Sequence, residues 1–299
     1  MSETFTVPVN KLVFSGHDTF HCRQLWLKKG YDFLQNGNKF TDSEAVVKLG
    51  VGKNMVSAIY FWMKAFGLLD KDGNLSDFAE YIFDTKSGKD PYLEDEATLW
   101  LLHYHLVTHG LASIYDLIFN DLRKEKIEFT KDNFLAFAER KANEIGFTQF
   151  NKKTAGTDFD VLTKLYIRTA EHIKDKEDTF SGLLTDLNLI QEEKKNNSLY
   201  SIPNENRTNL PEEIILYTIL DKPDFQNSIS LNIMFQDRNQ AGSVFAITKN
   251  SIMEKLESIS SNSKYQMYGM TLSDLAGVKE LQITSKPNKF DVLNYYYGK

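Results

Sequence analysis

The clearest pattern of apolar and polar positions in the chain spans residues 53–66. Apolar side chains recur there with the i, i+4, i+7, i+11 spacing of one helix face, at Met55, Ile59, Trp62 and Phe66. A face this apolar has to be buried. A second stripe with the same spacing lies on the other side of the helix and consists of Lys53, Ser57, Tyr60 and Lys64. The pattern therefore predicts an amphipathic helix that turns hydrogen-bond donors and cations away from the core.

The flanking residues predict that this helix is the second helix of a helix-turn-helix. Residues 42–49 fit a short preceding helix, and the Gly-Val-Gly sequence at 50–52 permits a tight turn. After the second helix, the Asp-Gly pair at 72–73 stands between apolar residues and indicates a hairpin, which would form a wing. We therefore expect a winged helix, with a first helix at 20–34 as its support.

The polar stripe consists of side-chain types that contact nucleic acids. Lysines bind phosphate oxygens, while hydroxyl and amide groups donate hydrogen bonds to phosphates or base edges. A P-loop is not expected, because Val47 and Asn54 stand where that motif needs Gly and Ser or Thr. A helix-turn-helix used only for packing or protein binding remains the alternative. The candidate DNA-binding residues are Lys53, Asn54, Ser57, Tyr60, Lys64 and Lys28.

The rest of the chain shows further helical periodicity with short hairpin signals. A helix end that feeds a hairpin near 183–203 is compatible with a second, degenerate winged helix, and residues 244–247 predict a short strand. The predicted fold class is mainly α with small β-hairpin wings. The predicted domains are a winged helix-turn-helix at 1–88, a helical domain at 89–205 that includes the degenerate second winged helix, and a C-terminal α+β domain at 206–299.

The charge distribution predicts one local basic surface on a protein that is acidic as a whole. The chain has 299 residues and a net charge of −6, which argues against a protein that coats nucleic acid without regard to sequence. Between residues 10 and 70, however, eight Lys and Arg residues oppose five Asp and Glu residues, a local net charge of +3. The basic part of the chain therefore coincides with the predicted helix-turn-helix.

The histidines were the only candidates for metal or acid–base chemistry. His17 and His21 have the i, i+4 spacing of helical metal ligands, but no third ligand is evident. We therefore expect Asp18 to cap the first helix and His17 to form a local hydrogen bond. His105 and His109 have the same spacing in apolar surroundings and are assigned to the core or an interface. The sequence predicts no catalytic residue, no metal, no cofactor and no enzymatic activity.

The single cysteine and the absence of long apolar segments bear on the cell compartment. Cys22 alone can form neither an internal disulfide nor a cysteine-based zinc site. No apolar run approaches 20 residues, and nothing resembles a signal peptide. We expect a cytoplasmic protein without a membrane partner.

Several short segments carry more specific motifs. They are FSGHDTF at 14–20, WLKKG at 26–30, LGVGKNMV at 49–56, LED at 93–95 and TLWLLH at 98–103. Together they closely resemble an uncharacterised bacterial family, domain of unknown function four thousand and seven, and the similarity covers nearly the whole chain. The family has no established activity. Its members resemble accessory proteins encoded beside sulfurtransferase-like enzymes of the phosphoadenosine-phosphosulfate reductase type and cysteine desulfurases, in DNA-modification or phage-defence neighbourhoods.

The resemblance implies a DNA-related role and a sulfurtransferase-like enzyme as a protein partner. Together with the polar stripe, it gives the leading hypothesis: a non-catalytic DNA-binding or target-recognition accessory protein of a bacterial DNA-modification or phage-defence system. The first alternative is a protein-binding scaffold without DNA contact, which burial of Lys53, Ser57 and Lys64 would favour. The second is a metal-dependent nuclease, which would need clustered carboxylates and histidines.

Overall fold

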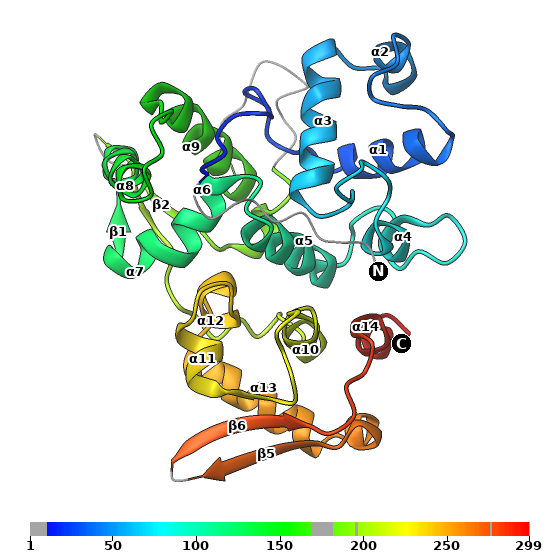
Figure 1. Ribbon diagram of the computed structural model, residues 1–299, viewed down its shortest axis with the longest axis vertical. Helices are drawn as coiled ribbons and strands as arrows, with labels where there is room; N and C mark the ends of the chain where they lie inside the picture. Colours follow the sequence, from blue (N-terminus) through cyan, green and yellow to red (C-terminus); the bar gives the residue numbers. More distant parts are fainter. Residues whose placement is uncertain (1–10, 169–181, 195–196, 276, 299) are drawn as a thin grey trace. The chain divides into compact units, whose positions relative to one another are not determined.

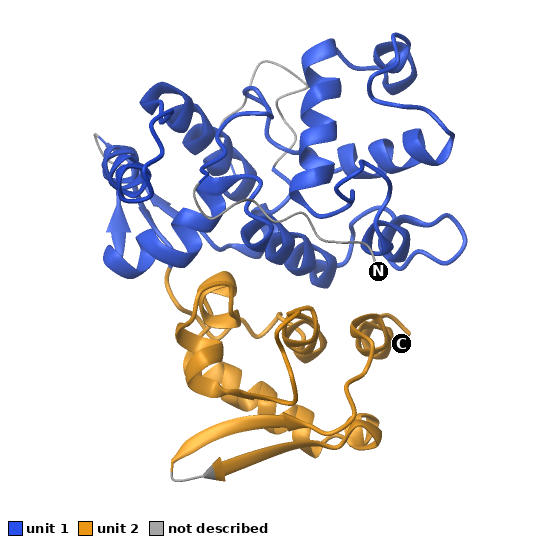
Figure 2. Ribbon diagram, viewed as in Figure 1, with its two compact units in different colours: residues 1–202 blue, residues 203–299 orange. Residues whose placement is uncertain are grey.

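The computed structural model describes residues 11–168, 182–194, 197–275 and 277–298 (Figure 1). The described chain is mostly helical and carries small antiparallel sheets of three strands, as the predicted fold class requires. It divides into two compact units, residues 1–202 and 203–299 (Figure 2). The predicted domains at 1–88, 89–205 and 206–299 stay a prediction, because compactness does not show which segments fold independently.

The predicted helix pair near residue 50 is present in the first unit. It consists of α2 (Ala45–Leu49) and α3 (Lys53–Ala65), preceded by α1 (Trp26–Gln35). Gly50 ends α2 in the left-handed conformation, with φ +62°. On the inner face of α3, Ile59 and Trp62 are fully buried, while Met55 is half-buried. One buried cluster between the three helices consists of Phe33, Ala45, Leu49 and Val56.

The first helix begins at Trp26, so the prediction of a helix from residue 20 was wrong. Three residues of the preceding segment have positive φ, namely Ser15 at +70°, Gly16 at +108° and Asp18 at +52°. Farther along, the Phe20 carbonyl accepts from the Trp62 indole N–H at 3.0 Å and the Cys22 carbonyl from the Leu183 N–H at 3.3 Å, so tertiary contacts take the place of helical hydrogen bonds. The N-cap of α1 is Leu25, which makes no side-chain cap, so the predicted capping role of Asp18 is also wrong.

The hairpin predicted after α3 is reduced to a single antiparallel bridge between Leu69 and Leu75. The Asp70 carboxylate holds its turn by accepting hydrogen bonds from the backbone N–H groups of Asp72 and Asn74. The chain then enters α4 (Asp77–Phe83), whose first turn is capped by the Ser76 hydroxyl. In place of the predicted wing, the structure has one short turn between two helices.

The centre of the first unit is α5 (Glu96–Thr108), which is apolar on every side. All of its residues from Ala97 to Val107 are buried. The Asp95 carboxylate accepts a hydrogen bond from Ala97 N–H and begins the helix. A helix surrounded in this way serves as the common core for the elements before and after it.

The remainder of the first unit combines a helical segment, two further helices and a small sheet. Strand β3 lies between β1 and β2 and runs antiparallel to both. A capping box at Thr130 begins α8, and the Asn151 side chain caps α9. The elements are α6 (Ser113–Asp116), the π-helical η1 (Leu117–Leu122), α7 (Arg123–Glu125), β1 (Glu128–Phe129), α8 (Lys131–Glu144), α9 (Lys152–Tyr166), the 3-10 helix η2 (Thr185–Leu187), β2 (Gln191–Glu193) and β3 (Leu199–Ser201).

The second unit repeats this mixture of helices and hairpin. Its sheet has the order β4-β6-β5, with β6 antiparallel to both neighbours. The strand predicted at 244–247 was wrong, because Val244 and Phe245 belong to a short helix that ends at Phe245, and Ala246 follows it in the left-handed conformation with φ +48°. The elements are α10 (Glu212–Leu220), β4 (Ser228–Ser230), α11 (Leu231–Gln236), α12 (Ala241–Phe245), α13 (Lys249–Ser261), the 3-10 helix η3 (Ser263–Tyr268), β5 (Met270–Leu275), β6 (Val278–Ile283) and α14 (Lys289–Tyr297).

Candidate nucleic-acid interface

The outer face of α3 is open to solvent at its beginning and lines a groove farther along. Lys53, Asn54 and Ser57 are exposed, while Tyr60 and Lys64 are half-buried. Gly52 precedes the helix and supplies no side-chain cap, so no side chain at the N-cap occupies the first-turn N–H groups. The first turn of α3 therefore combines unshielded N–H groups with the Lys53 cation.

Three of the candidate residues face one groove of about 1210 Å³. Ser57, Tyr60 and Lys64 contribute from α3. The other walls come from the segment at 13–16, the loop at 37–41 and the hairpin turn at 72–75. The groove thus lies along the outer face of α3, between the short hairpin turn and the chain that precedes α1.

A group of aromatic rings and a cation stands in this groove. The Lys64 ammonium lies 4.6 Å from the centroid of the Tyr60 ring, and the Phe40 and Tyr60 rings are 5.0 Å apart. A methyl group at Gly73 would lie only 3.0 Å from the Tyr60 hydroxyl, and the Gly73 backbone has φ +86°. The turn therefore needs glycine at this position, and Tyr60 is held against it. Aromatic rings next to a cation suit contact with bases or sugars at a phosphate backbone.

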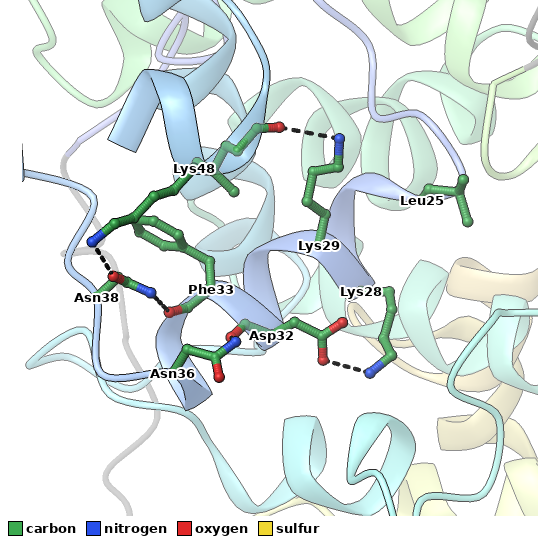
Figure 3. A pocket seen from close by; sticks show the side chains of 9 residues that line it. Leu25, Lys28, Lys29, Asp32, Phe33, Asn36, Asn38 and Lys48 are labelled. Atoms are coloured by element: carbon green, nitrogen blue, oxygen red, sulfur yellow. Dashed lines mark hydrogen bonds and ion pairs between the residues drawn. The ribbon is translucent and has the colours of Figure 1, made fainter. Parts of the chain in front are cut away.

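The candidate Lys28 lies apart from these residues, in a second cavity of about 610 Å³ that α1 and α2 line (Figure 3). Its ammonium is 2.5 Å from the Asp32 carboxylate, and its side chain is only 14% exposed. Lys29 donates to the backbone carbonyl of Leu49 at 3.1 Å, and Lys48 donates to the Asn38 side chain at 2.8 Å. All three lysines are thus held by neighbouring groups, and the structure separates Lys28 from the α3 stripe.

Sequence reasoning did not select Lys39 and Phe40, which line the groove beside Tyr60. Both residues lie in the loop between α1 and α2, where no periodicity fixes the direction of a side chain. In the sequence, the only indication was that these residues stand just before the predicted helix-turn-helix.

Behind α3, a buried cluster is built around His17. The His17 ring stacks on the Trp62 ring with a centroid distance of 5.3 Å and an interplanar angle of 10°. His17 Nδ1 donates to the Asp18 carbonyl at 3.1 Å, so the predicted local hydrogen bond is confirmed. Its Nε2 lies 3.6 Å from the Asp158 carboxylate, which also accepts the Ser15 N–H at 3.0 Å. Residues from three segments of the chain therefore meet at this imidazole.

Burial favours the neutral form of both titratable groups of this cluster. Desolvation lowers the pKa of His17 to about 4 and raises the pKa of Asp158 to about 7. A neutral imidazole that donates from Nδ1 presents an unprotonated Nε2 toward Asp158. The cluster packs and orients the segment before α1, and it is shielded from solvent.

Two further histidines, His103 and His105, lie among core side chains. His103 is buried and its Nδ1 is 2.7 Å from the Tyr166 hydroxyl, while His105 Nδ1 lies 3.2 Å from His109 Nε2. Within the described ranges, no three or more His, Cys, Asp or Glu side chains are grouped so that they could hold a metal ion. None of the described helices combines the length and apolar composition needed to cross a bilayer.

Comparisons with known proteins place the chain in a family. Two solved structures are similar over 96% of this chain and 88% of theirs. One is a crystal structure of SspB with magnesium bound, at 29% identity and a TM-score of 0.84; the other is a crystal structure of SspB at 28% identity and a TM-score of 0.83. No curated protein matches the chain. The family model described as "Protein of unknown function (DUF4007)" matches residues 14–297, and the chain belongs to this family.

Proposed function

We propose that the protein is a non-catalytic DNA-binding or target-recognition accessory protein of a bacterial DNA-modification or phage-defence system, and that α3 is its DNA-contacting helix. The observation that carries this proposal is the accessible polar face of α3. Lys53 and Ser57 are exposed, and Lys64 opens into the groove of about 1210 Å³. A face buried by packing would have favoured the scaffold alternative.

The order of the elements supports the same conclusion. Helices α1, α2 and α3 are followed at once by the hairpin turn that closes between Leu69 and Leu75, which is the order of a winged helix. In such proteins the helix after the turn enters the major groove, and the wing contacts the adjacent backbone. The wing here is short, so the helix supplies most of the proposed contact.

The dimensions of α3 fit this use. Lys53 and Lys64 are eleven residues apart in a continuous helix, which corresponds to a rise of about 16 Å. The major groove of B-DNA is about 12 Å wide and accepts one helix. The lysines can therefore reach phosphates at separate points along the groove, while Asn54 and Ser57 present hydrogen-bonding groups between them.

A salt-titrated binding assay on duplex DNA tests the proposal. Each phosphate contact contributes about 0.9 to the slope of log affinity against log salt, so Lys53→Ala with Lys64→Ala should reduce the slope by about 1.8. A matched control removes two exposed lysines outside α3, Lys86→Ala with Lys126→Ala, and should keep the slope. The proposal fails if the wild-type protein shows no salt-dependent affinity, or if the α3 variant binds with an unchanged slope.

The same assay separates a binding protein from a nuclease. SspB has been crystallised with magnesium bound, so the incubations should be run with magnesium and with a chelator. Intact DNA in both arms fits a non-catalytic protein. Magnesium-dependent nicking by the purified chain would replace the proposed role with a catalytic one.

A further inference from the structure

The arrangement around α3 recurs around α9 within the same compact unit. A helical segment from Ser113 to Glu125 leads to strand β1, then to α8 and α9, and finally to the β2–β3 hairpin. The last strand, β3, lies between the other two. This is the connectivity of a winged helix, with a more complete sheet than the bridge after α3. In this arrangement α9 occupies the place of the DNA-contacting helix.

The outer face of α9 carries a polar stripe with the same spacing as the stripe of α3. Lys153, Thr157, Asp160 and Lys164 follow one another at i, i+4, i+7 and i+11. Thr157 is half-buried and the other three residues are exposed, while Phe159 and Leu162 face the core. Both stripes thus have a lysine at each end and a hydroxyl side chain at the second position.

The side chains of the α9 stripe carry a net positive charge despite the aspartate. The Asp160 carboxylate is held by the Lys131 ammonium of α8 at 2.6 and 2.7 Å, which neutralises its charge. Among the residues that the structure describes, neither Lys153 nor Lys164 is paired with a carboxylate. Two unneutralised cations therefore flank a neutral pair, which complements the negative charge of a phosphate backbone.

The second compact unit has a similar order of helices and strands but lacks the lysine stripe, so the order of elements alone does not produce the charge pattern. Its helices α10, α11 and α13, strand β4 and the β5–β6 hairpin follow the same order, and β6 lies between β4 and β5. The exposed stripe of α13, however, consists of Asn250, Glu254, Glu257 and Ser261. Two carboxylates without a lysine repel phosphates, so the lysine stripes of α3 and α9 are specific to the first unit.

The buried cluster connects the two helices through their inner faces. His17 stacks on Trp62 of α3, and its Nε2 lies 3.6 Å from Asp158 of α9. Figure 1 shows the chain before α1 passing between these helices. Trp62 and Asp158 are buried on the sides opposite the polar stripes. The two stripes are consequently turned away from their shared contact.

We propose that α9 is a second duplex-binding helix, which contacts phosphates of its own through Lys153 and Lys164. The inference rests on the proposed function in one respect only, because it takes duplex DNA as the ligand. The two helices then engage separate stretches of backbone, and their contributions to the salt dependence of binding are additive.

The test uses the full chain and a duplex of defined length, with binding measured over a range of salt concentrations. Lys153→Ala with Lys164→Ala should lower the slope of log affinity against log salt by about 1.8, and combination with Lys53→Ala and Lys64→Ala should lower it by about 3.6. Lys153→Arg with Lys164→Arg keeps both charges and should retain the wild-type slope. Lys86→Ala with Lys126→Ala is again the charge-matched control. Thermal melts of every variant check that the fold is intact.

The outcomes separate this inference from the function proposed for α3. If the α9 variant keeps the wild-type slope while the α3 variant loses part of it, the α9 inference is wrong and the α3 role stands. If the α9 variant alone lowers the slope, the inference holds and the α3 role falls. If wild type has no salt-dependent affinity, both are wrong, and a protein partner is the better ligand for each stripe.

Discussion

His17 Nε2 lies 3.6 Å from an Asp158 oxygen, and the two side chains are 1% and 2% exposed. Burial favours the neutral form of both groups, but it changes their pKa values in opposite directions: it raises the pKa of Asp158 and lowers the pKa of His17. At mildly acidic pH the folded protein therefore holds a proton on the Asp158 carboxyl group that the unfolded chain has already released. At the same pH the folded His17 imidazole remains unprotonated, whereas the imidazole of the unfolded chain binds a proton.

The first prediction concerns the pH dependence of stability. Asp158 has a raised pKa of about 7, so its contribution is complete below the unfolded value of 3.8 and is lost as the pH rises through 7. His17 has a lowered pKa of about 4, so its contribution is complete above 6.5 and is lost as the pH falls through 4. Between about pH 4 and 6.5 the two trends oppose each other, and the pair should contribute little net slope.

Asp158→Asn removes one of these trends and exposes the other. Asparagine can still accept the Ser15 N–H, and the variant should lose on the order of 3 kcal/mol of stability between pH 6.5 and 4 relative to wild type. Urea unfolding at a series of pH values measures this difference. Asp160→Asn, on the exposed face of the same helix, serves as the control. A pH profile of Asp158→Asn parallel to that of wild type would contradict the assignment of two neutral groups.

The second prediction concerns the core side of α3. Trp62 is fully buried, stacks on His17 and donates its indole N–H to the Phe20 carbonyl at 3.0 Å. Trp62→Ala should lower the free energy of unfolding by about 3–5 kcal/mol, because it removes a large ring and leaves that carbonyl without its donor. Lys53→Ala, on the exposed side, should change it by less than about 0.5 kcal/mol. Denaturant melts of the two variants give the comparison; equal losses would contradict the assignment of the two faces.

The third prediction uses two glycines with similar backbone conformations. Gly73 has φ +86° and its missing Cβ would approach the Tyr60 hydroxyl, whereas Gly37 has φ +76° and open space around it. Gly37→Ala should cost about 1–2 kcal/mol from the left-handed backbone alone. Gly73→Ala should cost more, because Tyr60 must also move.

A double variant isolates the cost of displacing Tyr60 from the cost of the left-handed backbone. Adding Tyr60→Phe to Gly73→Ala removes the hydroxyl that the new methyl group would meet, so the stability should return to the level of Gly37→Ala. Thermal unfolding compares the three proteins. If Tyr60→Phe gives no recovery, the contact between the turn and Tyr60 does not constrain the hairpin.

The fourth prediction separates the lysines of the N-terminal helices. The Lys28 ammonium is already paired with Asp32, whereas Lys53 is exposed in the first turn of α3. Lys53→Ala should lower the salt slope of DNA binding by about 0.9, and Lys28→Ala should lower it much less because its charge is locally neutralised. Salt titrations of the single variants decide this. A larger effect of Lys28→Ala would move the proposed interface to the cavity between α1 and α2.

The elements that sequence periodicity could predict are those whose partners are near in the chain. The α2–α3 turn and the buried face of α3 follow from spacing and from Gly50. The segment before α1 could not be predicted, because the left-handed conformations of Ser15 and Asp18 are uncommon for these residue types and are set by tertiary contacts.

In the predicted site, too, the features that depend on nearby residues could be predicted and those that depend on distant residues could not. The stripe on α3 follows from helical spacing, but the groove beside it also requires the loop around Phe40 and the turn around Gly73. The proximity of His17 to Asp158 joins residues 141 positions apart, which no local pattern records. The stripe of α9 has the required spacing, but its exposure became apparent only when the structure showed which face packs.

The contacts of the segment at 13–17 also constrain how the protein forms during synthesis. Val13 exchanges hydrogen bonds with Ser113, and Ser15 and His17 meet Asp158. A ribosome releases the chain from its N-terminus, so this segment emerges first and its partners emerge much later. The segment cannot complete its native contacts until more than half of the chain has been translated. His17 and Trp62 are therefore both translated well before the Asp158 carboxylate that His17 faces in the folded protein.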